Sequence, residues 1–299
     1  MSLLVVGSVA LDCVQTPQGS VRDSLGGSAT YFSVSARLFS RVGMVAVVGR
    51  DFPEEHVQFL RSRGVDLSGM ERREGKTFRW HGRYGQDLND AKTLKTELNV
   101  FDAFRPSLPA AYRESQYLFL ANIDPDLQVS VLEQVNGPRL VACDTMNYWI
   151  VSKPEALKRV LKRVHLFLAN EAEAKQLAQE HNLLKAARAL VRMGPSIVII
   201  KRGEYGALLF KDEAVFWAPA YPLEAILDPT GAGDSFAGGF MGYLSARGTL
   251  GERDLRRALI YGSIMASFCV EDFGLGRLGS VRRHEIRERY ALFRSLTRF

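Results

Sequence analysis

Residues 227–240 form a glycine-rich stretch followed by the apolar pattern of a helix. Phe236, Phe240 and Leu244 recur every four residues, which is the spacing of one helix face. The turn before them contains Gly231, whose missing Cβ lets backbone approach a ligand closely. Free amides at a helix N-terminus, together with its partial positive charge, suit an anion such as phosphate. The stretch therefore predicts an anion-binding turn.

Asp234 falls in the first turn of the expected helix, beside the glycine amides. A carboxylate here would repel a phosphate unless it has a chemical role, and accepting a proton from an attacking hydroxyl fits. The amides of Gly231, Ala232 and Gly233 would then stabilise the charge that develops on the transferring group. An Asp at this position can also simply cap the helix, and the short pattern alone leaves that alternative open.

The full string Thr-Gly-Ala-Gly-Asp-Ser-Phe-x-Gly-Gly-Phe, which begins at Thr230, resembles the C-terminal signature of the ribokinase family, or PfkB-type carbohydrate kinases. The resemblance implies that Asp234 is the catalytic base and that residues 231–233 form an anion hole. It implies an ATP-dependent phosphotransferase that uses Mg²⁺ and phosphorylates a hydroxyl of a small sugar or polyol. The implied fold is a single α/β domain over residues 1–299, a ribokinase-like three-layer αβα sandwich with a central, mainly parallel sheet and a small β lid.

Asn170 and Glu173 lie where an apolar strand pattern gives way to helical spacing. One interpretation is a capping Asn with an acidic first turn, which the helix dipole favours. The family has an Asn-x-x-Glu motif at this point, so the resemblance implies that Asn170 binds nucleotide and that Glu173 acts on Mg²⁺ through water. Magnesium fits this chemistry, because the phosphates of ATP need charge neutralisation during transfer.

A second nucleotide motif follows the next strand pattern, at Lys201, Arg202, Gly203 and Gly206. The family usually has Thr-x-Gly-x-x-Gly here, in contact with phosphate and ribose, so we predict that these four residues bind nucleotide. Lys201 replaces the usual Thr and would hold a phosphate as a point charge. An exposed turn with chance basic residues is the alternative.

The substrate hydroxyls are expected near the N-terminus. Asp12 matches the family acid that binds them, and Gly26 and Gly27 match the N-terminal Gly-Gly signature. Tyr31 stands where that signature has Asn; its ring can stack on a substrate and its hydroxyl can donate a hydrogen bond, but it does not replace an amide. Ribose is therefore a less favoured substrate, and all four residues are predicted to bind the acceptor.

Short apolar runs alternate with helical patterns along most of the chain, which predicts an α/β fold with a parallel sheet. Several runs end in a polar residue, and ligands bind beyond the carboxyl ends of parallel strands. These residues should therefore line one rim close to Asp234. They are Asp12, Asn122, Asp144, Asn170 and Lys201. We predict that Asn122 contacts the substrate, whereas the roles of Asp144 and Asn147 stay open.

Residues 76–101 alternate with a period of two, as in half-exposed antiparallel strands, and a second strand is expected over residues 93–100. The family has a small lid here, so the resemblance implies a lid made by residues 76–101 with part of residues 10–25. Such a lid would keep water away from the phosphoryl donor. Exposed strand edges also leave a homodimer through the lid open.

Asp228 and Thr230 match positions that flank a monovalent cation in many relatives, which makes potassium a hypothesis to test. Two other functions stay open. Adenosine-type nucleoside kinases share these motifs, and a non-catalytic sugar- or nucleotide-binding regulator could use the same fold. The intact Asp234 and its glycines argue against the regulator.

The composition is that of an ordinary globular protein. The chain has 39 Lys and Arg against 33 Asp and Glu, and this mild excess contains no cluster that predicts nucleic-acid binding. No apolar stretch has the length of a membrane span. The three cysteines fit no metal or disulfide spacing, and the apolar start lacks the features of a signal peptide, so we predict a cytoplasmic protein.

Overall fold

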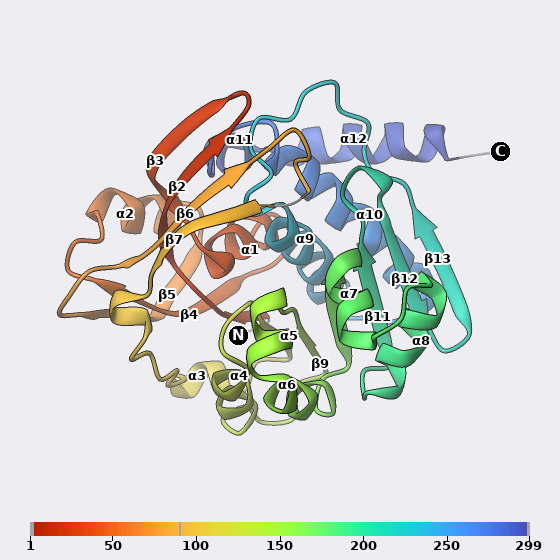
Figure 1. Cartoon of the computed structure of the whole chain (residues 1–299), viewed down its shortest axis with the longest axis horizontal. Coiled ribbons are helices and arrows are strands. Elements are labelled where there is room, and N and C mark those ends of the chain that lie inside the picture. Colours follow the sequence, from red (N-terminus) through yellow and green to blue (C-terminus); the bar gives the residue numbers. More distant parts are fainter. Residues whose placement is uncertain (1–2, 90, 298–299) are drawn as a thin grey trace.

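The computed structural model of the protein describes residues 3–89 and 91–297 and contains one large sheet and one small sheet (Figure 1). The strands of the large sheet are β1 (Leu3–Val6), β4 (Val42–Gly49), β5 (Val65–Arg73), β8 (Tyr117–Leu120), β9 (Leu140–Cys143), β10 (Leu166–Asn170), β11 (Ile197–Lys201), β12 (Ala207–Lys211) and β13 (Ala214–Ala218). Their order across the sheet is β13-β12-β11-β10-β9-β8-β1-β4-β5. Pairs from β5 to β11 are parallel, whereas β12 and β13 pair antiparallel at one edge.

Helices cover both faces of the large sheet, because alternate strand residues point to opposite sides. Leu3 and Val5 belong to one buried cluster, and Leu4 and Val6 belong to the other. The helices on the Leu3 side are α1 (Ser28–Ala36), α2 (Glu54–Ser62), α9 (Ala232–Arg247), α10 (Glu252–Cys269), α11 (Gly276–Ser280) and α12 (Arg283–Leu296). Those on the other side are α3 (Ala110–Arg113), α4 (Pro125–Leu132), α5 (Asn147–Ser152), α6 (Pro154–Leu161), α7 (Glu171–Ala178) and α8 (Leu183–Arg192). The predicted three-layer α/β sandwich with a mainly parallel sheet is confirmed.

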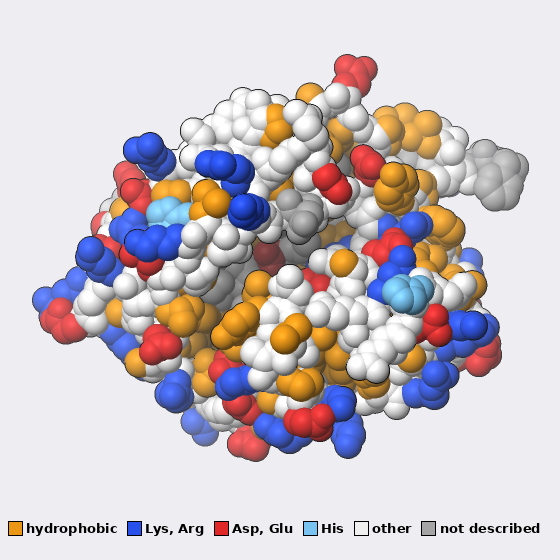
Figure 2. Space-filling model, viewed as in Figure 1, with side chains coloured by type: hydrophobic (Ala, Val, Ile, Leu, Met, Phe, Trp, Pro, Cys, Tyr) orange, Lys and Arg blue, Asp and Glu red, His pale blue; other side chains and the backbone are white. Residues whose placement is uncertain are grey.

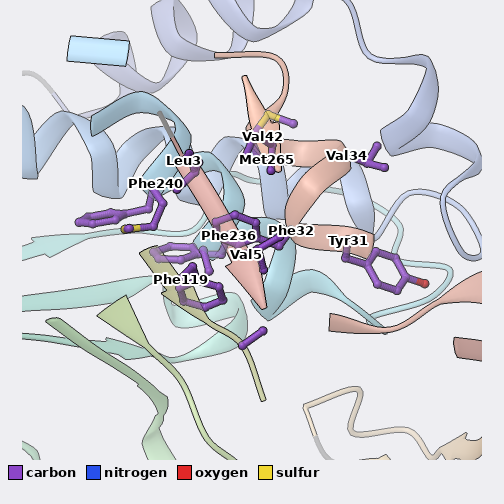
Figure 3. Packing of buried hydrophobic residues seen from close by; sticks show 14 of the residues in the cluster. Leu3, Val5, Tyr31, Phe32, Val34, Val42, Phe119, Phe236, Phe240 and Met265 are labelled. Atoms are coloured by element: carbon purple, nitrogen blue, oxygen red, sulfur yellow. The ribbon is translucent and has the colours of Figure 1, made fainter. Parts of the chain in front are cut away.

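Aromatic rings pack in the core where α1 and α9 lie against β1 and β8. The rings of Phe32 and Phe119 stack with centroids 4.5 Å apart, and Figure 3 shows Phe236 beside them, next to Val5. Every residue of α9 from Ser235 to Leu244 is buried. Tyr31 points away from this group (Figure 3). Aromatic packing around Phe236 therefore fixes the first turns of α9 against the sheet.

The small sheet contains β2 (Ala10–Thr16), β3 (Gly19–Gly26), β6 (Phe78–Tyr84) and β7 (Ala91–Glu97), in the order β3-β2-β6-β7. Strands β2 and β6 are parallel, and the other two pairs are antiparallel. The strand expected over residues 93–100 was wrong at its end, because Asn99 has a φ of 50° and begins a 3₁₀ turn, η1 (Asn99–Phe101). A homodimer through this sheet stays a prediction.

None of the described helices has the length and apolar character needed to cross a membrane.

Candidate active site

The N-terminus of α9 carries the predicted anion hole. Gly231 precedes the helix with a φ of 75°, a conformation that favours glycine. A Cβ on this residue would overlap the ring of Tyr31. The Ala232 amide donates to the Pro229 carbonyl at 3.2 Å, so one of the three predicted donors has a local partner. The anion-hole role of residues 231–233 stays a prediction.

Lys201, at the end of β11, reaches this turn from the neighbouring strand. A Cβ on Gly233 would lie only 2.9 Å from the Lys201 ammonium nitrogen. The glycine therefore leaves room for a positive charge directly over the helix N-terminus. Two independent sources of positive potential, the helix end and the ammonium, meet at one point.

Carboxyl groups gather around this charge. Burial raises the pKa of Asp234 to about 6; the Lys201 ammonium opposes the rise and Glu173 adds to it. Burial and the neighbouring Asp234 also hold the pKa of Asp144 well above its usual range. One Asp144 oxygen, Oδ1, is buried without a hydrogen-bond partner. The cluster suits a ligand that brings compensating positive charge.

Asp12 lies on β2 of the small sheet and is held by Gly26, the last residue of β3, and by Gly27, which follows it. A Cβ on Gly26 would overlap its carboxylate, and the Gly27 amide donates to it. Burial and then Asp228 raise the pKa of Asp12 to about 7, while the Gly27 hydrogen bond lowers it. The charge of Asp234 also raises the pKa of Asp12, so the predicted base interacts electrostatically with the acid predicted to bind the acceptor.

Gly27 also starts α1. Its φ is 95°, and a Cβ there would lie 2.5 Å from the Ser8 carbonyl oxygen. Tyr31, one turn later, is 2% exposed with its ring against Gly231. Burial raises the pKa of the Tyr31 hydroxyl well above its usual range, which keeps the group protonated. Stacking of this ring on a substrate stays a prediction.

Asn122 follows β8 and is held by α5. Its Oδ1 accepts from the Trp149 indole at 3.0 Å, and its Nδ2 contacts the Met146 sulfur at 3.2 Å. Asn147 takes part in a local contact, in which its Oδ1 accepts from the Tyr148 amide at 2.8 Å. Trp149 therefore orients Asn122, the residue predicted to contact the substrate. Nothing in the sequence around Trp149 indicated this role.

Asn170 and Glu173 form a reciprocal capping box at the start of α7. The Glu173 amide donates to Asn170 Oδ1 and the Asn170 amide donates to Glu173 Oε2, each at 2.8 Å. Burial raises the pKa of Glu173, and Lys201 lowers it. The capping interpretation is thus confirmed, whereas the actions on nucleotide and magnesium stay predictions that this geometry permits.

Arg202 links the two predicted nucleotide motifs. Its guanidinium forms an ion pair with Glu171, in the first turn of α7, and lies over the Trp217 ring with 5.1 Å to the centroid. Gly203 and Gly206 bracket the turn η2 (Gly203–Tyr205) with φ values of 53° and 86°. Arg202 thereby fixes the turn, and a direct contact with nucleotide stays a prediction.

Asp228 and Thr230 shape the loop before α9. Asp228 accepts from the amides of Thr230 at 2.9 Å and Gly274 at 3.2 Å, and the Cys269 thiol donates to the Thr230 carbonyl at 3.4 Å. These bonds hold the loop, and binding of a monovalent cation here stays a prediction.

The small sheet contacts the same loop through two residues that sequence reasoning missed. Thr230 Oγ1 donates to the Tyr84 hydroxyl at 3.2 Å, and Thr16 Oγ1 donates to the Leu227 carbonyl at 2.9 Å. The alternation of residues 76–101 predicted a strand that contains Tyr84, but nothing in the sequence indicated its partner. Figure 2 shows the face of the molecule hollowed between the small sheet and helices α5 and α7, with acidic side chains in the hollow.

Comparison with known proteins identifies the family. The sequence profile described as pfkB family carbohydrate kinase matches residues 1–279. The chain is 32% identical to a cytidine kinase of Thermococcus kodakarensis over 83% of this chain and 90% of that protein. It is 27% identical to a nucleoside kinase of Methanothermobacter thermautotrophicus over 91% of this chain and 90% of that protein.

A solved structure shares the fold at low identity. The crystal structure of a putative ribokinase II from E. coli, in complex with ATP and Mg²⁺, is 20% identical with a TM-score of 0.80, covering 97% of this chain and 99% of that chain. This likeness independently supports the three-layer architecture.

Proposed function

The chain belongs to the pfkB family of carbohydrate kinases, and from this premise we propose that it transfers the γ-phosphoryl group of ATP to a hydroxyl of a nucleoside. A sugar or polyol was the first expectation from the sequence. The observation that favours a nucleoside is the 32% identity with a cytidine kinase across most of both chains. ATP as donor is supported by the ATP complex of the structurally similar ribokinase II.

Asp234 is the base in this reaction. Its carboxylate takes the proton of the acceptor hydroxyl while the hydroxyl oxygen attacks the γ-phosphorus. The bond from that phosphorus to the bridging oxygen breaks, ADP leaves with the bond electrons, and the proton on Asp234 later passes to solvent. The raised pKa of Asp234 suits this role, because a carboxylate with a pKa of about 6 is ionised at neutral pH yet basic enough to accept a proton.

The helix N-terminus and Lys201 hold the phosphoryl group. Positive potential from both meets over Gly233, where negative charge is carried by the transferring oxygens. Asp12 accepts hydrogen bonds from hydroxyls of the acceptor, and its contact with the Gly27 amide keeps it in place. Binding energy on the acceptor thus aligns one hydroxyl with Asp234.

The residues present fit a magnesium ion held mainly by phosphate and water. No group of three or more His, Cys, Asp or Glu suited to a metal occurs within residues 3–89 and 91–297, so the protein supplies no complete cage. The unpartnered Asp144 oxygen and the Glu173 carboxylate are the groups that would hold such an ion, with water between. Magnesium would supply neutralisation of the phosphate charge during transfer.

A substrate panel tests the proposal. Purified protein with ATP and Mg²⁺ is offered pyrimidine and purine nucleosides, ribose, fructose and inositols, with ADP formation coupled to a readout and products identified by mass. We expect ADP formation that depends on a nucleoside and yields a nucleoside monophosphate. If only free sugars were phosphorylated, the acceptor would be a carbohydrate and the proposed nucleoside substrate would be wrong. If nucleotide bound but no acceptor were phosphorylated, the result would favour the non-catalytic regulator over an enzyme.

A further inference from the structure

The hairpin of β6 and β7 extends beyond the predicted acceptor site. Trp80 is in register with Asp12 across the parallel β2–β6 pair, so this end of the hairpin lies beside the acceptor acid. Tyr84, four residues further along β6, lies beside Thr230. The hairpin therefore runs from the acceptor acid toward the start of α9 (Figure 1).

The turn of the hairpin reaches the opposite side of the hollow. Asn89 lies against Gly203, since a Cβ on Gly203 would overlap the Asn89 side-chain oxygen. The Asn89 amide donates to Asp87 Oδ1 at 2.8 Å, which shapes the turn. Gly203 has a φ of 53°, and this glycine both permits the turn after β11 and leaves room for Asn89.

Gly203 belongs to the predicted nucleotide motif, on the side of the hollow formed by β11 and α9. It follows Lys201 by two residues, and the Lys201 ammonium lies over Gly233 at the start of α9. One hairpin thus lies beside the predicted acceptor acid through Trp80, contacts the loop before α9 where β6 ends, and contacts the turn after Lys201 at its tip. A lid that served the acceptor alone would need the first of these contacts and neither of the others.

The geometry points to a donor-binding role for the hairpin: Asn89 contributes to the site of the nucleoside triphosphate, and Tyr84 positions Thr230 and with it the turn at Gly231. This inference rests on the proposed function and assigns the donor side of the same site. An amide both donates and accepts hydrogen bonds, so Asn89 can pair with ribose hydroxyls or with phosphate oxygens. ADP would then leave only when the hairpin tip lifts from Gly203.

Nucleotide binding tests Asn89 without any need for the acceptor. The dissociation constants of ADP and of a non-hydrolysable ATP analogue are measured by calorimetry for the wild type, for Asn89→Ala and for the control Leu94→Ala. Leu94 lies on the same hairpin, is 46% exposed and lines the outer face of the small sheet with Cys13 and His81. We expect Asn89→Ala to weaken nucleotide binding about fivefold to tenfold, the size of one lost hydrogen bond, and Leu94→Ala to leave it unchanged.

Limited trypsin digestion supplies a second readout on the same variants. Arg83, Lys92 and Lys95 are exposed cleavage sites on the hairpin. ADP should slow cleavage there in the wild type and in Leu94→Ala, and should protect Asn89→Ala less. Equal nucleotide affinity and equal protection in Asn89→Ala and wild type would overturn the donor role. Failure of every acceptor in the substrate panel would refute the proposed function while these binding measurements still decide the role of Asn89.

Tyr84→Phe tests the positioning role, because it removes the hydroxyl and keeps the ring. We expect kcat to fall about fivefold to tenfold, with both KM values within about twofold of wild type, since one hydrogen bond to the loop before α9 is lost. An unchanged kcat, or a change confined to the KM of the acceptor, would contradict positioning of the loop by Tyr84.

Discussion

The helical layer next to Asp234 and the small sheet differ in how far their side chains are buried. Along α9 the residues from Ser235 to Leu244 are all buried, and the Phe32 and Phe119 rings stack below them. In β7 the residues from Lys92 to Thr96 are all exposed. Close packing resists displacement of the helix, whereas a strand with exposed side chains, such as β7, separates at a lower cost in free energy.

Strands β2 and β3 place Leu11 and Leu25 in the main core, whereas the hairpin of β6 and β7 depends more on directional contacts. Arg79 pairs with Asp51 at 3.1 Å, and Tyr84 and Thr16 bond to the loop before α9. Exposed ion pairs stabilise proteins by about 0–1 kcal/mol each. The difference teaches that the predicted base is placed by close packing, whereas the hairpin of β6 and β7 is placed largely by hydrogen bonds and ion pairs.

Replacement of the base should give the largest effect. Asp234→Asn is expected to lower kcat by about 10²–10⁴-fold, the usual range for a general base. Folding should not suffer, because the raised pKa of Asp234 means that its ionised form is unfavourable in the folded state and the neutral amide removes that cost. Steady-state kinetics and thermal unfolding at pH 8 check both parts. Near-normal turnover would refute the assignment.

Loss of packing in the helical layer should come next. Phe119→Ala removes a fully buried ring stacked on Phe32 and is expected to lower the free energy of unfolding by about 3–5 kcal/mol. Urea denaturation followed by circular dichroism measures the change. A loss below about 1 kcal/mol would mean that this layer is no more rigid than the sheet.

The dependence of activity on pH should show how Lys201 affects the pKa of Asp234. With folded pKa values raised to about 6 for Asp234 and about 7 for Asp12, the ionised carboxylates are lost as pH falls, so kcat/KM should decline below about pH 7. Lys201→Met removes the cation that lowers the pKa of Asp234, so the acid limb should move to higher pH. A pH profile of the variant with an unmoved limb would contradict this coupling.

A change in the small sheet should have the smallest effect on stability. Arg79→Met removes the exposed ion pairs with Asp23 and Asp51 and is expected to lower the free energy of unfolding by less than about 1 kcal/mol. Hydrogen exchange should nevertheless speed up in β6 and β7, since local opening becomes easier. Global destabilisation comparable to that of Phe119→Ala would abolish the contrast between the two regions.

Local sequence patterns were sufficient for the layers and for part of the site. Helical spacing after Asp234 predicted α9, and the apolar runs that end in Asn170 and Lys201 predicted β10 and β11. The spacing of Asn170 and Glu173 could not distinguish a capping box from a magnesium motif, because both require the same separation of three residues.

Such local patterns could not predict contacts between segments that are distant in the sequence. Tyr84 and Thr230 are separated by 146 positions, and nothing in either neighbourhood indicates the other. The support of Asn122 by Trp149 depends on how α5 packs at the end of β8. Arg202 was predicted to bind nucleotide because it lies within the motif that resembles the family's Thr-x-Gly-x-x-Gly, whereas its ion pair with Glu171 emerges only when β10 and β11 lie side by side.

The contact of Tyr31 with Gly231 limits how this chain can vary. Because the aromatic ring occupies the space that any side chain at 231 would need, even alanine is excluded there while tyrosine remains at 31. A smaller residue at 31 would remove this overlap and leave a gap beside the helix start, but the φ of 75° at residue 231 would still favour glycine. Glycine at 231 is therefore required twice, by its backbone conformation and by the Tyr31 ring, and a change at 31 alone cannot free the position for another residue.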